Sequence, residues 1–227
     1  MNKTLDAGIK IISGYALLIP VCVEEFSHID IQGKMSFNVL QYEINGLGNL
    51  SAMTSGPAGM QMISLVITPF EKNMPLMSAD FIIGGENIKA FVELYDLVPD
   101  RNTAEYTGVL EAARELERRY SGIGDITAER RWYSDLVSVG LYKTGKSGDE
   151  RFDELFCDAL RCYMEKAAEL PVLNAEEKAK KLALTQEYTD RLISEGGAST
   201  DVFKMILGEE KTRQFFGKVF FGTERRR

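Results

Sequence analysis

The stretch PLMSADFII, residues 75–83, is followed by GGEN at 84–87 and by a second apolar run, KAFVELY, at 89–95. Two such runs around a glycine-rich turn predict a β-hairpin. Both arms are apolar beyond simple alternation, so we expect both faces of the hairpin to be covered. The hairpin therefore indicates a central sheet that is buried between other elements.

Asp80 lies in the middle of the first arm. Because side chains alternate along a strand, Asp80 shares a face with Ser78 and Ile82. An ionised carboxylate on a buried strand must find partners, or its pKa must rise, and a carboxylic acid with a raised pKa can donate protons in catalysis. A structural Asp that is hydrogen-bonded to a neighbouring loop is the alternative. Asp80 is the first candidate catalytic residue.

Composition limits the classes of function. The chain has 227 residues and no low-complexity tract or linker, so we expect a single domain over residues 1–227. A net charge of −7 argues against a general nucleic-acid binder. The apolar run at 9–23 is too short to span a membrane and is interrupted by Gly14 and Pro20. We interpret that run as a first helix packed on the sheet rather than a signal peptide, and expect no membrane partner.

Cysteine and histidine usage argues against metal chemistry. The three cysteines, Cys22, Cys157 and Cys162, show no C-x-x-C spacing, so disulfides and structural zinc are not expected. Unpaired cysteines favour a reducing, cytoplasmic location. The single histidine, His28, stands in a polar stretch typical of a surface loop, and one histidine leaves few metal sites or His-based triads open.

The order of predicted elements indicates the fold class. Strands at 34–43, 50–54 and 60–68 precede the hairpin, and their short connections require antiparallel pairing. Thr103 is expected to cap a helix, and 136–142 to form a last strand or a helix start. Further helices are expected at 152–163, 174–193, 200–207 and 209–220. The sequence thus predicts an α/β protein, a three-layer α/β/α sandwich around a central, mainly antiparallel sheet, with a pocket between the sheet and one helical layer.

Several segments resemble one enzyme family. The PLMSAD segment at 75–80 resembles the Pro-x-x-x-x-Asp strand of the ferredoxin-dependent bilin reductases and the related red chlorophyll catabolite reductases. WYS at 132–134, with the following 136–143, resembles the passage from their sheet to the C-terminal helices, and 186–221 is similar to the closing helices. The resemblance implies a linear tetrapyrrole in the pocket, no metal or flavin, and single electrons taken from ferredoxin. Asp80 matches the family's proton-donating Asp.

Other proton-handling positions depart from the family pattern. Some members carry a pocket His on the strand before that Asp, and alignment on Pro69 places Ser64 there. Many members have a second Asp near the last helices, where this chain offers Asp190 and Asp201, neither in clean register. Asp201 is the second candidate catalytic residue, and Ser64 a candidate substrate-binding residue. Proton supply is therefore expected to be reduced, sufficient for one two-electron reduction or for none.

Cations are expected to bind the substrate's propionate groups. Arginine suits carboxylates because its guanidinium donates two parallel hydrogen bonds. The candidate substrate-binding cations are Arg130, Arg131 and Lys143, with a solvated surface position as the alternative for at least two of them. The paired arginines are also candidates for a basic patch that docks acidic ferredoxin.

Three hypotheses remain open at this stage. The first is a bilin-type reductase in which Asp80 protonates the substrate. The second is a non-catalytic tetrapyrrole carrier on the same fold, favoured by the missing His. The third is an unrelated α/β/α protein in which Asp80 has only structural partners.

Overall fold

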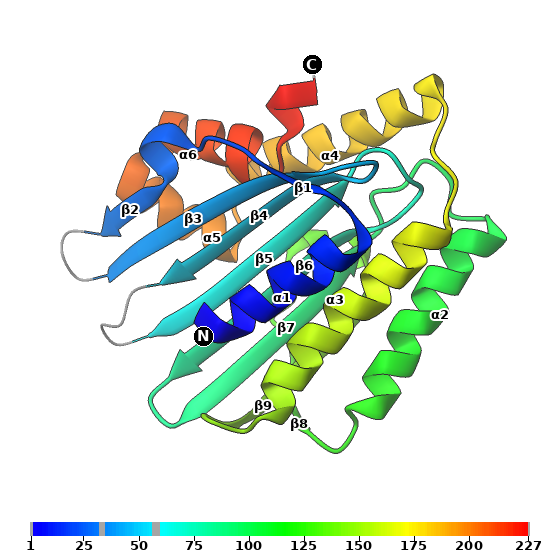
Figure 1. Cartoon of the computed structure of the whole chain (residues 1–227). Coiled ribbons are helices and arrows are strands. Elements are labelled where there is room, and N and C mark those ends of the chain that lie inside the picture. The colour runs from blue at the N-terminus through cyan, green and yellow to red at the C-terminus, as the bar shows by residue number, and fades with distance from the viewer. Residues whose placement is uncertain (1, 32–34, 56–59, 227) are drawn as a thin grey trace.

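A single large sheet forms the centre of the molecule, in a computed structural model that describes residues 2–31, 35–55 and 60–226 (Figure 1). The strands are β1 (Leu18–Pro20), β2 (His28–Ile31), β3 (Met35–Ile44), β4 (Gly48–Ser55), β5 (Gln61–Pro69), β6 (Leu76–Gly84), β7 (Asn87–Tyr95), β8 (Gly124–Asp125) and β9 (Val137–Lys146). The described strands pair antiparallel in the order β1-β3-β4-β5-β6-β7-β9-β8, and β2 also pairs with β3. Short connections account for the antiparallel pairing from β3 to β7, whereas β9 pairs with β7 after the long connection that contains α2.

Helices begin at the N-terminus and dominate the second half of the chain. They are α1 (Asn2–Tyr15), α2 (Ala104–Arg119), α3 (Arg151–Glu169), α4 (Ala175–Glu195), α5 (Ala198–Leu207) and α6 (Glu209–Gln214), with the 3-10 helices η1 (Glu24–Phe26), η2 (Trp132–Leu136) and η4 (Thr223–Arg226) and the π-helix η3 (Phe215–Phe220). Thr103 caps α2 as predicted, since its side chain accepts a hydrogen bond from the Tyr106 amide at 3.1 Å. Asn174 and Glu177 form a capping box at the start of α4.

The predicted hairpin is β6 and β7. Gly84 pairs with Asn87, so Gly85 and Glu86 form a two-residue loop. Gly85 has a φ of +60°, in the left-handed region that favours glycine. This register sets Ser78 opposite Glu93 on β7. On the other side of β6, β5 sets Ser64 opposite Asp80.

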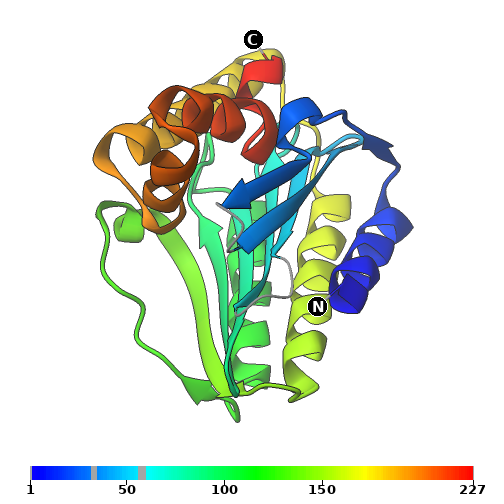
Figure 2. The ribbon, with the colours of Figure 1, turned by 90° about the vertical axis from the view of Figure 1, so that its left-hand side faces the viewer.

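The two faces of the sheet carry two separate apolar cores. One core joins α1, α2 and α3 to the sheet and includes Met77, Ala79 and Phe81 from β6. The other core includes Leu76 from β6 and joins the opposite face to α4, α5 and η3. Figure 2 shows α1 and α3 on one side of the sheet and the C-terminal helices on the other. The predicted mixed α/β fold with a large antiparallel sheet is confirmed.

Some element boundaries differ from those predicted. The helix expected over 9–23 ends at Tyr15, and the chain continues as edge strand β1, where Pro20 is tolerated because it ends an outer strand. His28, expected in a surface loop, begins strand β2 and is exposed. Residues 136–142 belong largely to strand β9. Within the described residues, no helix combines the length and apolar character needed to cross a membrane.

The helix expected over 209–220 changes to π geometry at Phe215, and side chains of the sheet bind the carbonyl groups at the end of this segment. Gln41 donates to the Lys218 carbonyl at 2.9 Å, and Asn49 donates to the carbonyls of Val219 and Phe220 at 3.1 and 3.2 Å. Ser51 donates to the Phe220 carbonyl at 2.7 Å. These buried polar side chains hold the C-terminal segment against the sheet.

Candidate active site

A cavity of about 630 Å³ lies between the sheet and the C-terminal helices. Even-numbered residues of β6, among them Ser78 and Asp80, and odd-numbered residues of β7, among them Glu93, form its floor. The segment 126–134 between β8 and β9 lines it as well, together with residues of α4, α5 and η3. Its volume is in the range of about 300–1,000 Å³ that is typical of small-molecule sites. The position matches the pocket predicted between the sheet and one helical layer.

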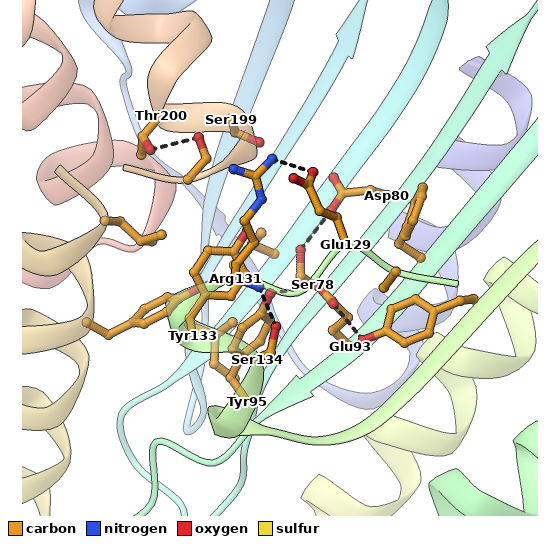
Figure 3. Close-up of a pocket in the computed structure, with 18 of the residues that line it drawn as sticks. Ser78, Asp80, Glu93, Tyr95, Glu129, Arg131, Tyr133, Ser134, Ser199 and Thr200 are labelled. Carbon is orange, nitrogen blue, oxygen red and sulfur yellow. Dashed lines mark hydrogen bonds and ion pairs between the residues drawn. The ribbon is translucent and has the colours of Figure 1, made fainter. Parts of the chain in front are cut away.

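Asp80 lies on the floor of this cavity in a weakly polar setting. Ser78 donates a hydrogen bond to the Asp80 carboxylate at 3.1 Å (Figure 3). Burial raises the pKa of Asp80 to about 6; the negative charge of Glu93 adds to the rise, and hydrogen bonds from Ser64 and Ser78 oppose it. A carboxyl group with this pKa carries its proton in about half of the molecules at pH 6 and in roughly a tenth at pH 7, far more than an ordinary Asp, so Asp80 can act as a general acid.

Glu93 is a second carboxylate on the same floor, and two phenols bind it. Tyr95 donates to Glu93 at 2.6 Å and Tyr142, from β9, donates at 2.9 Å. Burial, and next the charge of Glu93, raises the pKa of Tyr142, and burial raises that of Tyr95 well above its usual range. Both phenols therefore stay protonated and act as hydrogen-bond donors. The two floor carboxylates thus have different surroundings, with hydroxyls of serine at Asp80 and of tyrosine at Glu93.

Aromatic rings form a wall of the cavity. The ring of Tyr188 on α4 lies 5.3 Å from that of Tyr95 and 6.4 Å from that of Tyr133, measured between centroids. Trp132 packs edge-on against Tyr133 and donates from its indole nitrogen to the Gly196 carbonyl at 2.8 Å. Tilted and edge-on contacts of this kind are favourable for aromatic groups. Such a wall suits a planar conjugated ligand.

Two cations also line the cavity. Arg131 donates to Glu129 at 2.7 Å, and the Arg131 amide donates to Ser134 at 2.9 Å, which fixes the backbone at the start of η2 (Figure 3). Lys89 on β7 also lines the cavity and is exposed, and among the described residues no carboxylate pairs with it. An anionic ligand group can therefore bind at either of these two cations.

The structure places some of the predicted site residues in the lining of the cavity and others outside it. Asp80 and Arg131 line the cavity. Ser64 is buried at the cross-strand position beside Asp80, so it contacts that acid rather than the cavity lining. Arg130 points into solvent, paired with Asp135 at 3.3 Å.

Two assignments made from sequence need correction. Lys143 pairs with Ala90 of β7, whose side chain belongs to the core under α2 and α3, so Lys143 lies on the face of the sheet opposite the cavity. It is buried there and forms an ion pair with Asp125 at 2.5 Å. Asp201 is exposed on α5, and the cavity is lined by its neighbours Ser199 and Thr200 rather than by Asp201 itself. Neither residue is placed to contact a ligand in this cavity.

Sequence reasoning missed Glu93, Tyr95 and Tyr142. The signal for Glu93 was present, since a two-residue loop after Gly84 sets Glu93 opposite Ser78 on the face of Asp80. The same alternation sets Tyr95 on this face, opposite Leu76. Tyr142 had no such signal, because β9 is distant in sequence from the hairpin with which it pairs. Within the described residues, no three His, Cys, Asp or Glu side chains gather as a metal site.

Comparison with solved structures identifies a protein with a similar fold. The chain is similar to phytochromobilin synthase from tomato, solved with selenomethionine and in complex with biliverdin, with a TM-score of 0.78 and 17% sequence identity. The match covers 99% of this chain and 83% of the tomato chain. No family model and no curated protein matches the sequence. The resemblance to the bilin reductases that the hairpin predicted is thus confirmed at the level of the fold.

Proposed function

We propose that this protein reduces a linear tetrapyrrole, takes electrons one at a time from ferredoxin, and uses Asp80 as a proton donor. The observation that carries the proposal is the position of Asp80. It is an acid with a pKa of about 6, and it lies on the floor of a cavity of about 630 Å³. A similar fold binds biliverdin in the tomato protein. Such a carboxyl group can deliver a proton near neutral pH, as protonation during reduction requires.

The distribution of charge over the cavity suggests how a bilin would lie. Its pyrrole N–H groups would face the carboxylates of Asp80 and Glu93, and its propionates would face Arg131 and Lys89, where charge-assisted hydrogen bonds form. The aromatic wall around Tyr188 would contact the conjugated system. Reduction of one double bond consumes two electrons and two protons, and Asp80 would deliver one of these protons.

A cytoplasmic location remains part of the proposal. Cys22, Cys157 and Cys162 are free thiols, which supports a reducing compartment. We propose no bound cofactor, with the electrons supplied by ferredoxin at an external surface. The exposed Arg130 remains a candidate for that docking surface, because electrostatic complementarity favours an acidic partner there.

The test is an anaerobic absorbance titration with biliverdin, followed by addition of reduced ferredoxin. We expect saturable binding and then a spectral change to a reduced bilin. The Asp80→Asn variant should bind biliverdin with similar affinity but accumulate a one-electron-reduced radical, because the proton donor is lost. Binding without any reduction in the unsubstituted protein would instead indicate a carrier, and absence of binding would contradict the proposal altogether.

A further inference from the structure

Glu93 lies on the cavity floor with both of its carboxylate oxygens held by phenols (Figure 3). Tyr95 donates to Oε2 at 2.6 Å, and Tyr142 donates to Oε1 at 2.9 Å. A carboxylate offers about four acceptor positions, two on each oxygen. The two phenols occupy one position on each oxygen and leave a second on each, on a side chain that lines the cavity.

The strand register explains how Tyr142 reaches Glu93. Glu93 pairs with Gly140 of β9, whereas Tyr142 pairs with Phe91. Tyr142 therefore reaches Glu93 along the diagonal between the strands, and its ring passes over Gly140. A Cβ atom at Gly140 would lie only 2.5 Å from the Tyr142 hydroxyl oxygen. Any side chain at this position would displace the phenol, so the hydrogen bond depends on a glycine here.

Tyr95, the second phenol, is also held in place. It follows Glu93 by two residues, so it lies on the same face of β7, and it is buried. Its ring lies 5.3 Å from that of Tyr188 and 6.2 Å from that of Tyr133, measured between centroids. Because neighbours hold both phenols, the Glu93 carboxylate has one defined orientation. It is a preorganised acceptor, which loses little conformational freedom when a ligand binds.

The other charged groups of the lining do not offer the same acceptor. Lys89 lies on the same face of β7, but an ammonium group only donates hydrogen bonds. Glu129 is an exposed carboxylate that is paired with Arg131 at 2.7 Å. Asp80 gives up a proton in the proposed function instead of accepting hydrogen bonds. Glu93 is thus the carboxylate of this lining that is placed to receive the donor groups of a ligand.

We propose that Glu93 binds the substrate by accepting hydrogen bonds from two neighbouring pyrrole N–H groups, one on each oxygen, and that Tyr95, Tyr142 and Gly140 are positioning residues. This inference rests on the proposed function and adds a basis for specificity. In an open-chain tetrapyrrole, rings that share one bridging carbon can turn their N–H groups to the same side, where two parallel acceptors match them. A tetrapyrrole whose nitrogens hold a metal ion has no such donors, so the site selects the metal-free ligand.

Biliverdin labelled with ¹⁵N tests this contact directly. In the complex with the unsubstituted protein, two N–H proton signals should lie downfield because they are hydrogen-bonded. Glu93→Gln replaces one acceptor oxygen by an amide group that donates. At least one of the two signals should then move upfield, and the Kd for biliverdin should rise about 10- to 100-fold. Unchanged N–H signals together with an unchanged Kd would overturn the proposal.

Gly140→Ala tests the positioning without changing a residue of the cavity lining. The added methyl group should displace the phenol of Tyr142 from Glu93 and raise the Kd severalfold. Tyr142→Phe removes the same hydrogen bond without adding a group, so it should also raise the Kd. Gly108→Ala on α2 is the matched control, because a Cβ atom there meets nothing within 4 Å, and it should leave the Kd unchanged. Equal Kd values in all three variants would show that Tyr142 does not position Glu93.

The zinc complex of biliverdin tests the predicted specificity. The unsubstituted protein should bind biliverdin more tightly than its zinc complex, and Glu93→Gln should lose most of this preference because the acceptor is gone. These measurements use binding without a reductant, so they do not depend on turnover. Reduction of biliverdin with no effect of Glu93→Gln on binding would refute the role of Glu93 and leave the proposed function standing. Failure of the unsubstituted protein to bind biliverdin would contradict both.

Discussion

Asp80 shows how a single residue on a buried strand acquires a functional property. The hairpin motif predicted that Asp80 lies on a strand, and the alternation of side chains predicted that it shares a face with Ser78 and Ile82. Its pKa of about 6 could not be predicted from the sequence. That value depends first on burial and then on Ser64, Glu93 and Ser78, which three strands bring together.

The pKa of Asp80 predicts how the stability of the protein depends on pH. The pKa is about 6 in the folded protein and about 3.8 in the unfolded chain, so the folded state binds the proton more tightly. Between these two values, the unfolded state loses its proton first as pH rises, and the free energy of unfolding falls. The total loss should be about 2–3 kcal/mol, and it should be absent in Asp80→Asn.

Urea unfolding of both proteins at pH values from 4 to 7.5 measures this difference. Asp201→Asn is the matched control, because that exposed carboxylate should leave the pH dependence of the parent protein intact. Parallel curves for the parent protein and Asp80→Asn would show that the folded and unfolded states bind this proton equally.

Adjacent arginines provide a second test at the scale of the residue. Arg131 lines the cavity, whereas Arg130 pairs with Asp135 in solvent. If Arg131 binds a propionate, Arg131→Ala should raise the Kd for biliverdin about 10- to 100-fold, as expected for the loss of charge-assisted hydrogen bonds. Arg130→Ala should change the Kd less than about twofold. Equal effects of the two substitutions would place the propionate elsewhere.

At the scale of elements, the cavity depends on how the C-terminal segment docks on the sheet. The π-helix η3 presents Phe216 and Phe220 to the cavity, and Asn49 on β4 binds the carbonyls of Val219 and Phe220. The sequence predicted a helix over 209–220 but not its π geometry or its contacts with the sheet, since the side chain that donates to those carbonyls lies about 170 residues earlier in the chain. Long-range partners of this kind have no local pattern.

Asn49→Ala tests this docking. Asn49 is buried, and its loss removes the side-chain donor of the Val219 carbonyl, one of two donors to the Phe220 carbonyl and one of two acceptors of the Gln41 amide, so the free energy of unfolding should fall by about 2–4 kcal/mol. Asn38→Ala, on the neighbouring strand, removes only an exposed hydrogen bond with His28 and should cost less than about 1 kcal/mol. Chemical denaturation measures both values. An equal, small effect of the two substitutions would mean that other contacts hold η3 in place.

At the scale of the whole molecule, the sequence was most informative where neighbours in the chain are neighbours in space. The antiparallel strands and the hairpin followed from short turns and alternation, and the mixed α/β fold followed from their order. The wall of the cavity, in contrast, combines β5 to β7 with segments after residue 126. Lys143 was misassigned for this reason, because the register between β7 and β9 decides which face it occupies.

The central claim is that Asp80 donates a proton to a tetrapyrrole bound in this cavity, and the pH dependence of a single reduction tests it most directly. Protein with bound biliverdin is mixed anaerobically with reduced ferredoxin, and the decay of the one-electron-reduced bilin is followed by stopped-flow absorbance. The decay rate should be constant below about pH 6 and then fall tenfold per pH unit, since only protonated Asp80 reacts. Asp80→Asn should decay at a low rate that does not depend on pH in this range. A rate that is independent of pH between 5 and 8 in the parent protein, or equal rates in the two proteins, would contradict the claim.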